Sequence, residues 1–159
     1  MNSTIAFPLT VFFDGACPIC QDEIALLKQY DTNANLRFED CSSPHYTPPS
    51  DAPEGVTREA MMTLIHGRDA QGQWLVGAPV FAGAYAGCGF PELAWLWGSP
   101  RLQPLWRVVY PRVARNRKLL SKLGASHALS WVLSRLSARA IARARKATCA
   151  CEAGPKTSD

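Results

Sequence analysis

The feature that most constrains this chain is a pair of cysteines, Cys17 and Cys20, at the junction of a predicted strand and a predicted helix. Residues 10–13 are β-branched or aromatic, as is typical of a strand, and residues 21–30 carry apolar side chains at helical spacing. Cys17 therefore falls at the start of the helix. Pro18 suits the first helical position, because its ring fixes a helical φ and its missing N–H would have had no partner there.

This placement predicts a reactive dithiol. Unpaired backbone amides and the positive end of the helix dipole would face the Cys17 sulfur and favour its thiolate form. In such sites the thiol pKa typically falls to roughly 3.5–7.5 from about 8.5. Cys20 lies one turn further along the same face, close enough to form a disulfide with Cys17. We therefore expect Cys17 to act as the nucleophile and Cys20 as the resolving thiol.

Asp14 is the third candidate for the site. It precedes Cys17 by three residues, at the end of the predicted strand, where its carboxylate is a candidate proton acceptor for Cys20. A second interpretation stays open, in which Asp14 only caps the helix or shapes a turn with Gly15.

A zinc site is the main alternative for the cysteine pair. Zinc usually takes four ligands, most often from a second spaced pair. The remaining candidates do not repeat the spacing of the first pair; they are Cys41, His45, Cys88, Cys149 and Cys151. A Cys-x-x-Cys between a strand and a helix is typical of redox sites, so we expect no resident metal and no cofactor.

Several segments carry a family resemblance. The chain resembles the DCC family of thiol-disulfide oxidoreductases at residues 13–20 with Glu23 shortly after, and again at residues 36–40, 62–66, 72–78 and 110–117. The resemblance implies a thioredoxin-like fold and an enzyme that performs dithiol exchange, but it implies no particular substrate. We expect the partner to be a disulfide-containing protein or a small-molecule thiol substrate. A thiol system would serve as the reductant.

The rest of the chain predicts an α/β fold: a thioredoxin-like four-stranded mixed sheet with flanking helices and a C-terminal helical extension. Residues 36–40 are expected to form a strand parallel to the first, because a helix connects the two. Residues 42–54 contain four prolines and predict a surface loop. Residues 61–66 and 74–77 are expected to form an antiparallel hairpin, and residues 78–88 a helix.

Charge divides the chain. Residues 1–100 hold four Lys or Arg against eleven acids, whereas residues 101–146 hold twelve Lys or Arg and no acid. We expect a redox domain at 1–100, a basic helical extension at 101–147 packed on or beside it, and a flexible tail at 148–159. Helices are expected at residues 110–123 and from residue 126.

The basic extension has two interpretations. A basic amphipathic helix binds an anionic membrane surface or a partner protein, but a solvated basic face explains the same pattern. No motif points to specific nucleic-acid binding. The alternative function is accordingly a non-enzymatic metal-binding or partner-docking module that uses the cysteine pair and the basic helices.

The expected compartment is the cytoplasm. Residues 1–7 lack the basic start and apolar core of a secretory signal, and no apolar run reaches the roughly 18 residues of a membrane span. In a reducing compartment, the six cysteines would be free, catalytic or metal-bound rather than a disulfide framework.

Overall fold

The computed structural model describes residues 5–122 and residue 135, and within this range the chain forms four strands and five helices. Their order is β1 (Leu9–Phe13), α1 (Pro18–Tyr30), β2 (Leu36–Asp40), α2 (Arg58–Thr63), β3 (His66–Arg68), β4 (Trp74–Val76), α3 (Ala78–Gly87), α4 (Pro91–Gly98) and α5 (Gln103–Lys122).

The strands form one mixed sheet in the order β2-β1-β3-β4. β1 and β2 are parallel, with Leu9 opposite Leu36, because α1 carries the chain back to the same end of the sheet. β3 is antiparallel to β1 and β4 is antiparallel to β3, with Phe12 opposite His66. The expected four-stranded mixed sheet is thus confirmed, and the architecture is consistent with a thioredoxin-like fold.

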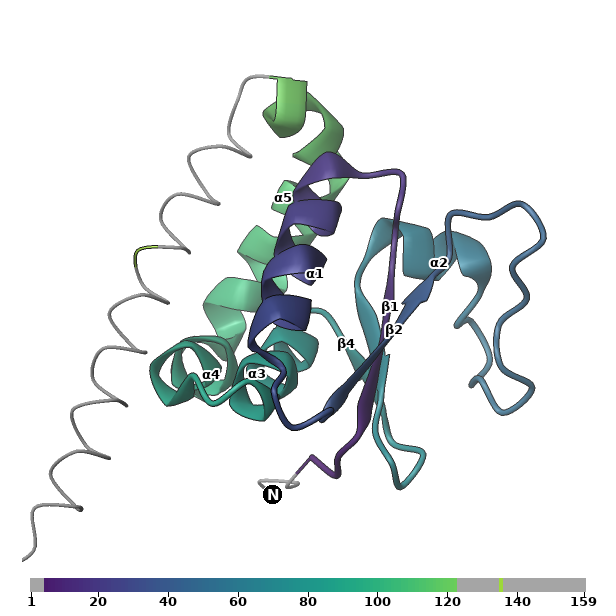
Figure 1. Cartoon of the computed structure of the whole chain (residues 1–159). Helices are drawn as coiled ribbons and strands as arrows, with labels where there is room; N and C mark the ends of the chain where they lie inside the picture. The colour runs from purple at the N-terminus through teal and green to yellow at the C-terminus, as the bar shows by residue number, and fades with distance from the viewer. Residues whose placement is uncertain (1–4, 123–134, 136–159) are drawn as a thin grey trace, which may run out of the picture.

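The two faces of the sheet are covered unequally (Figure 1). α1, α3, α4 and α5 lie on one side, and α2 lies on the other. The alternation of side chains along β1 produces both interfaces. Leu9 and Val11 are fully buried in the core shared with α1 and α3. Phe12 points the other way, packing with Met61 of α2 and stacking on Trp74 at a ring-centroid distance of 5.2 Å.

The prediction of a strand at residues 61–66 is wrong. Residues 58–63 form α2, and β3 begins only at His66. Thr57 explains the helix, because its side-chain oxygen accepts a hydrogen bond from the N–H of Ala60 at 3.2 Å and caps the first turn. The local cap outweighs the apolar pattern, and Met61 is buried from a helix rather than from a strand.

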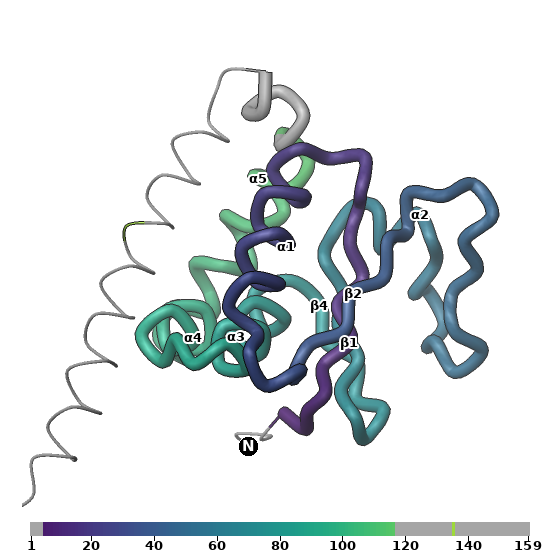
Figure 2. The backbone as a smooth tube through the Cα atoms, in the orientation of Figure 1, coloured from purple at the N-terminus to yellow at the C-terminus, as the bar shows by residue number. Residues whose placement is uncertain are grey.

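The C-terminal part of the described chain is helical, as expected. α3 confirms the helix expected at 78–88, ending at Gly87. α5 confirms the helix expected at 110–123 but begins earlier, at Gln103, and contains Pro111. The backbone trace shows α5 running beside α1 (Figure 2), and the two helices are in contact.

Several predictions lie outside the described residues: the helix from residue 126, the tail at 148–159, and the surroundings of Cys149 and Cys151. The proposed boundary between residues 100 and 101 stays a prediction, although α5 contacts α1, α3 and α4. None of the helices within residues 5–122 is long and apolar enough to span a membrane.

Candidate functional site

The cysteine pair occupies the first turn of α1. Cys17 is the N-cap residue, with extended backbone angles (φ −99°, ψ 115°), and Pro18 follows in the first turn of the helix. The Cys17 carbonyl accepts a hydrogen bond from the N–H of Gln21 at 3.0 Å, and the Cys17 N–H donates to the Asp14 carbonyl at 3.1 Å. The predicted placement of Cys17 at the helix start is confirmed.

The two sulfurs differ in access. Both residues are thiols in this structure, as are Cys41 and Cys88. Cys17 has an exposed fraction of 0%, whereas Cys20 is partly exposed. Reactive cysteines combine a stabilised thiolate with access to their substrate. The helix start favours Cys17 as the thiolate and exposure favours Cys20 as the point of entry, so the expected order of attack stays a prediction.

The turn before Cys17 is held by two carboxylates. Asp14 is buried, and its Oδ1 accepts a hydrogen bond from the N–H of Ala16 at 3.0 Å, which matches its expected turn-shaping role. Asp40 at the end of β2 accepts from the N–H of Gly15 at 2.9 Å. A Cβ atom on residue 15 would lie 2.1 Å from the Asp40 Oδ2, so only glycine allows this approach. The role of Asp14 as a proton acceptor stays a prediction.

Hydrogen bonds also tune the Asp40 carboxyl. Slight burial raises its pKa, but hydrogen bonds from Ser42 and from the N–H of Gly15 outweigh that effect and lower it. Asp40 therefore stays ionised and joins the end of β2 to the turn that carries the dithiol.

A cavity of about 240 Å³ lies beside Cys20. It is lined by the end of β1, the first turns of α1, and side chains from α2 to α5 or the loops beside them, and it is open to solvent on one side. Asp14 also lines it, but Cys17 does not. The other lining residues are mainly apolar or aromatic: Phe13, Ile19, Glu23, Ile24, Met61, Ile65, Phe81, Tyr85, Trp97, Tyr110, Val113 and Ala114. The dithiol therefore adjoins an apolar space rather than a polar groove.

One polar pair, formed by the buried Tyr85 and the half-buried Glu23, interrupts the apolar wall. The hydroxyl of Tyr85, a residue only 1% exposed, donates a hydrogen bond to the Glu23 carboxylate. Burial raises the pKa of Glu23 above its ordinary value, and the hydrogen bond from Tyr85 partly offsets this. Burial and the neighbouring Glu23 charge also raise the pKa of Tyr85.

Neither Glu23 nor Tyr85 is among the site residues predicted from the sequence, although Glu23 belongs to the stretch that carries the family resemblance. Glu23 carried a detectable signal, because it lies three residues after Cys20 and therefore on the same side of α1. Tyr85 carried none, since it is 62 residues from Glu23 in the chain.

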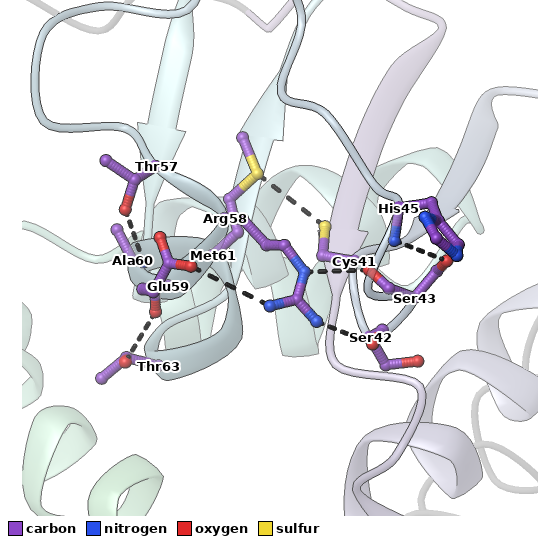
Figure 3. A network of polar contacts seen from close by, with 10 residues as sticks. All are labelled: Cys41, Ser42, Ser43, His45, Thr57, Arg58, Glu59, Ala60, Met61 and Thr63. Atoms are coloured by element: carbon purple, nitrogen blue, oxygen red, sulfur yellow. Dashed lines mark hydrogen bonds and ion pairs between the residues drawn. The ribbon is translucent and has the colours of Figure 1, made fainter.

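Cys41 lies in a separate cluster on the α2 side of the sheet (Figure 3). Its Sγ is 3.8 Å from the Sδ of Met61, and it is fully buried. Burial raises the pKa of the Cys41 thiol to about 11, which leaves it unreactive near neutral pH. His45 and Tyr46 do not line the cavity beside Cys20.

Arg58 holds the loop after β2 against α2. Its guanidinium donates to the carbonyls of Ser43 at 2.9 Å and Ser42 at 2.8 Å (Figure 3). His45 is exposed on this loop, where its N–H donates to the Ser43 hydroxyl at 3.3 Å. These contacts give the cluster a structural role.

Cys88 also has a packing role. Its Sγ lies 3.5 Å from the Leu27 carbonyl, and burial raises its pKa to about 12. Within the described part of the chain, no group of three or more His, Cys, Asp or Glu side chains is arranged to hold a metal ion. The described residues therefore offer no set of ligands for the zinc site considered as the alternative.

Comparison with known proteins adds one match. Residues 11–123 match the family model described as DCC1-like thiol-disulfide oxidoreductase, a span that runs from within β1 through α5. No curated protein and no solved structure matches the chain significantly. Because the match covers more than half of the 159 residues and includes the dithiol, the cavity and Glu23, the chain belongs to the DCC1-like thiol-disulfide oxidoreductase family.

Proposed function

We propose that this protein exchanges the Cys17–Cys20 dithiol with the disulfide bond of a protein or small-molecule substrate. The observation that carries the proposal is the position of both thiols on the first turn of α1, with Cys20 on the wall of an apolar cavity. Family membership supports the same reaction class. Neither Cys41 nor Cys88 is suited to this chemistry, because burial raises both of their pKa values.

The exchange proceeds in two displacements. One thiolate of the pair attacks a sulfur of the substrate disulfide, which breaks the S–S bond, forms a mixed disulfide and releases one thiol. The second thiolate then attacks the mixed disulfide and releases the other thiol. Two electrons pass to the substrate, and the pair is left as a disulfide. An external thiol reductant restores the dithiol.

Proton transfer requires a base near Cys20. Asp14 remains the acceptor expected from the sequence, and Glu23 is a second candidate that lines the same cavity one turn beyond Cys20. A general base works best when its pKa lies near the operating pH. Burial moves the pKa of Glu23 in that direction, which favours Glu23 in this role.

The test is a redox titration of the purified protein in defined glutathione buffers, with mass spectrometry of both sulfurs. We expect a reversible two-electron couple in the wild type, and its loss in Cys17→Ser and in Cys20→Ser. Cys88→Ala is the matched control and should keep the couple. Full disulfide reductase activity in Cys17→Ser would overturn the mechanism.

The same preparation tests the alternative function. Stoichiometric zinc in freshly purified protein, lost in Cys17→Ser or Cys20→Ser, would favour a metal-binding module. Binding of an anionic membrane or a partner protein to the basic part of the chain stays a prediction. Helix α5 contributes three exposed arginines to such a surface: Arg107, Arg112 and Arg115. The cytoplasmic location also stays a prediction.

A further inference from the structure

We propose that the cavity beside Cys20 is the substrate site and that it takes the apolar group of a small, neutral organic disulfide. This inference rests on the proposed disulfide exchange and specifies its substrate class. It also assigns the first attack to Cys20, the cysteine of the pair that lines the cavity.

The size of the cavity sets the size of the group. An apolar cavity of about 150 Å³ in a protein core holds benzene. The cavity here, at about 240 Å³, has room for a somewhat larger aromatic ring or a short alkyl chain, but not for a peptide segment. Phe13, Phe81 and Trp97 supply aromatic wall, and Val113 and Ile19 supply aliphatic wall. Such walls favour apolar groups because burial removes apolar surface from water.

The charges around the cavity exclude anions. Its lining contains two carboxyl residues, Asp14 and Glu23, and no Lys, Arg or His among the described lining residues. An anionic disulfide would lose water without gaining a cationic partner and would meet like charge. A neutral disulfide avoids both costs.

Access selects the attacking sulfur. Cys17 is 0% exposed and is absent from the cavity wall, whereas Cys20 is partly exposed and lines it. The Cys20 thiolate attacks the bound disulfide R–S–S–R, forming Cys20–S–S–R and releasing R–S⁻, which takes up a proton. The Cys17 thiolate then attacks the Cys20 sulfur, releases the second R–S⁻ and closes the Cys17–Cys20 disulfide. The two electrons come from the dithiol, and an external dithiol returns them.

Single-turnover oxidation with matched disulfides tests the inference. Reduced full-length protein is mixed with dipropyl disulfide, with bis(2-hydroxyethyl) disulfide, or with 3,3′-dithiodipropionate. The first two compounds differ by a terminal methyl against a hydroxyl, and the third is anionic. Each rate is divided by the rate at which dithiothreitol reduces the same compound, which corrects for the different intrinsic reactivities of the three disulfides.

We expect the normalised rate with dipropyl disulfide to exceed that with the hydroxyethyl compound by about tenfold or more, since each compound must bury its end group. The anionic compound should be slowest. In Cys17→Ser, dipropyl disulfide should leave a mixed disulfide on Cys20, and this should form faster than the corresponding adduct on Cys17 in Cys20→Ser. Faster trapping on Cys17 would overturn the assigned order.

A variant that fills the cavity gives the second comparison. Ala114 lies on the cavity wall and is 7% exposed, so Ala114→Phe places a ring in the space. The ratio of the normalised rate with dipropyl disulfide to that with the hydroxyethyl compound should fall toward one. Ala86 is exposed on α3 and does not line the cavity, so Ala86→Phe is the matched control and should keep the preference.

A direct binding measurement tests the cavity even if the Ala114→Phe variant does not fold. Toluene is titrated into the Cys17→Ser/Cys20→Ser double variant, and amide resonances are followed by NMR. Saturable shifts should centre on cavity residues such as Ile19 and Ala114, and no saturable shift would overturn the inference. Equal normalised rates for all three disulfides would overturn the inference alone. A protein that reduces none of them and never pairs its cysteines would overturn the proposed function as well.

Discussion

Removing the hydroxyl group of Tyr85 is the sharpest test of the site's polar pair. The Tyr85 side chain is 1% exposed, and its ring packs edge-on against Phe90 at a centroid distance of 6.3 Å. Tyr85→Phe keeps that ring and deletes only the group that donates to Glu23. Loss of one hydrogen bond to a half-buried carboxylate costs about 1–3 kcal/mol of unfolding free energy. For a chain of this size, the melting temperature should fall by roughly 2–12 °C.

The cost should depend on pH. Burial gives the folded Glu23 a pKa above its ordinary value of 4.5, so its contribution to stability is present below pH 4.5 and is lost as pH rises through the folded pKa. The Tyr85 hydroxyl limits this loss by stabilising the carboxylate. Without the hydroxyl, the pKa of Glu23 rises further, so the destabilisation should be larger at about pH 8 than at about pH 5.

Urea unfolding in reducing buffer at both pH values provides the measurement. Glu23→Gln and the double variant complete a double-mutant cycle, in which Tyr85→Phe should cost less when Glu23 is already replaced. A destabilisation under about 0.5 kcal/mol, or one that is equal at both pH values, would show that the hydrogen bond does not hold this acid in the folded protein.

Three further outcomes follow from the geometry. Gly15→Ala should destabilise the protein by about 0.5–1.5 kcal/mol in urea unfolding, because its Cβ would displace the Asp40 carboxylate and remove the hydrogen bond from the N–H of residue 15; an unchanged midpoint would refute this role of the close approach. Met61→Ala should cost about 2–5 kcal/mol in the same assay because Met61 is fully buried, and a loss under about 1 kcal/mol would contradict that packing. Iodoacetamide at about pH 8 should modify Cys20 while leaving Cys41, whose pKa is raised to about 11, unmodified by mass spectrometry; equal labelling of the folded protein would show that Cys41 is not buried.

Local chemistry made much of the fold predictable. β-branched and aromatic residues gave β1, Pro18 marked the first turn of α1, and a helix between two strands required a parallel pair. Each of these inferences depends on residues that are neighbours in the chain. The prediction of a strand at 61–66 is wrong because Thr57, also a local signal, caps a helix there, and a short apolar run fits a helix as well as a strand.

The candidate site divides in the same way. The spacing of Cys17 and Cys20 was enough to predict that they share the first turn of a helix, since three residues of α-helix bring two side chains onto one face. It did not determine which sulfur is accessible, because the burial of Cys17 depends on packing around the helix start. Tertiary packing brings Tyr85 to Glu23 across 62 residues and assembles the cavity beside Cys20 from β1 and all five helices. These features come from contacts between distant segments, and such contacts leave no period or spacing in the chain.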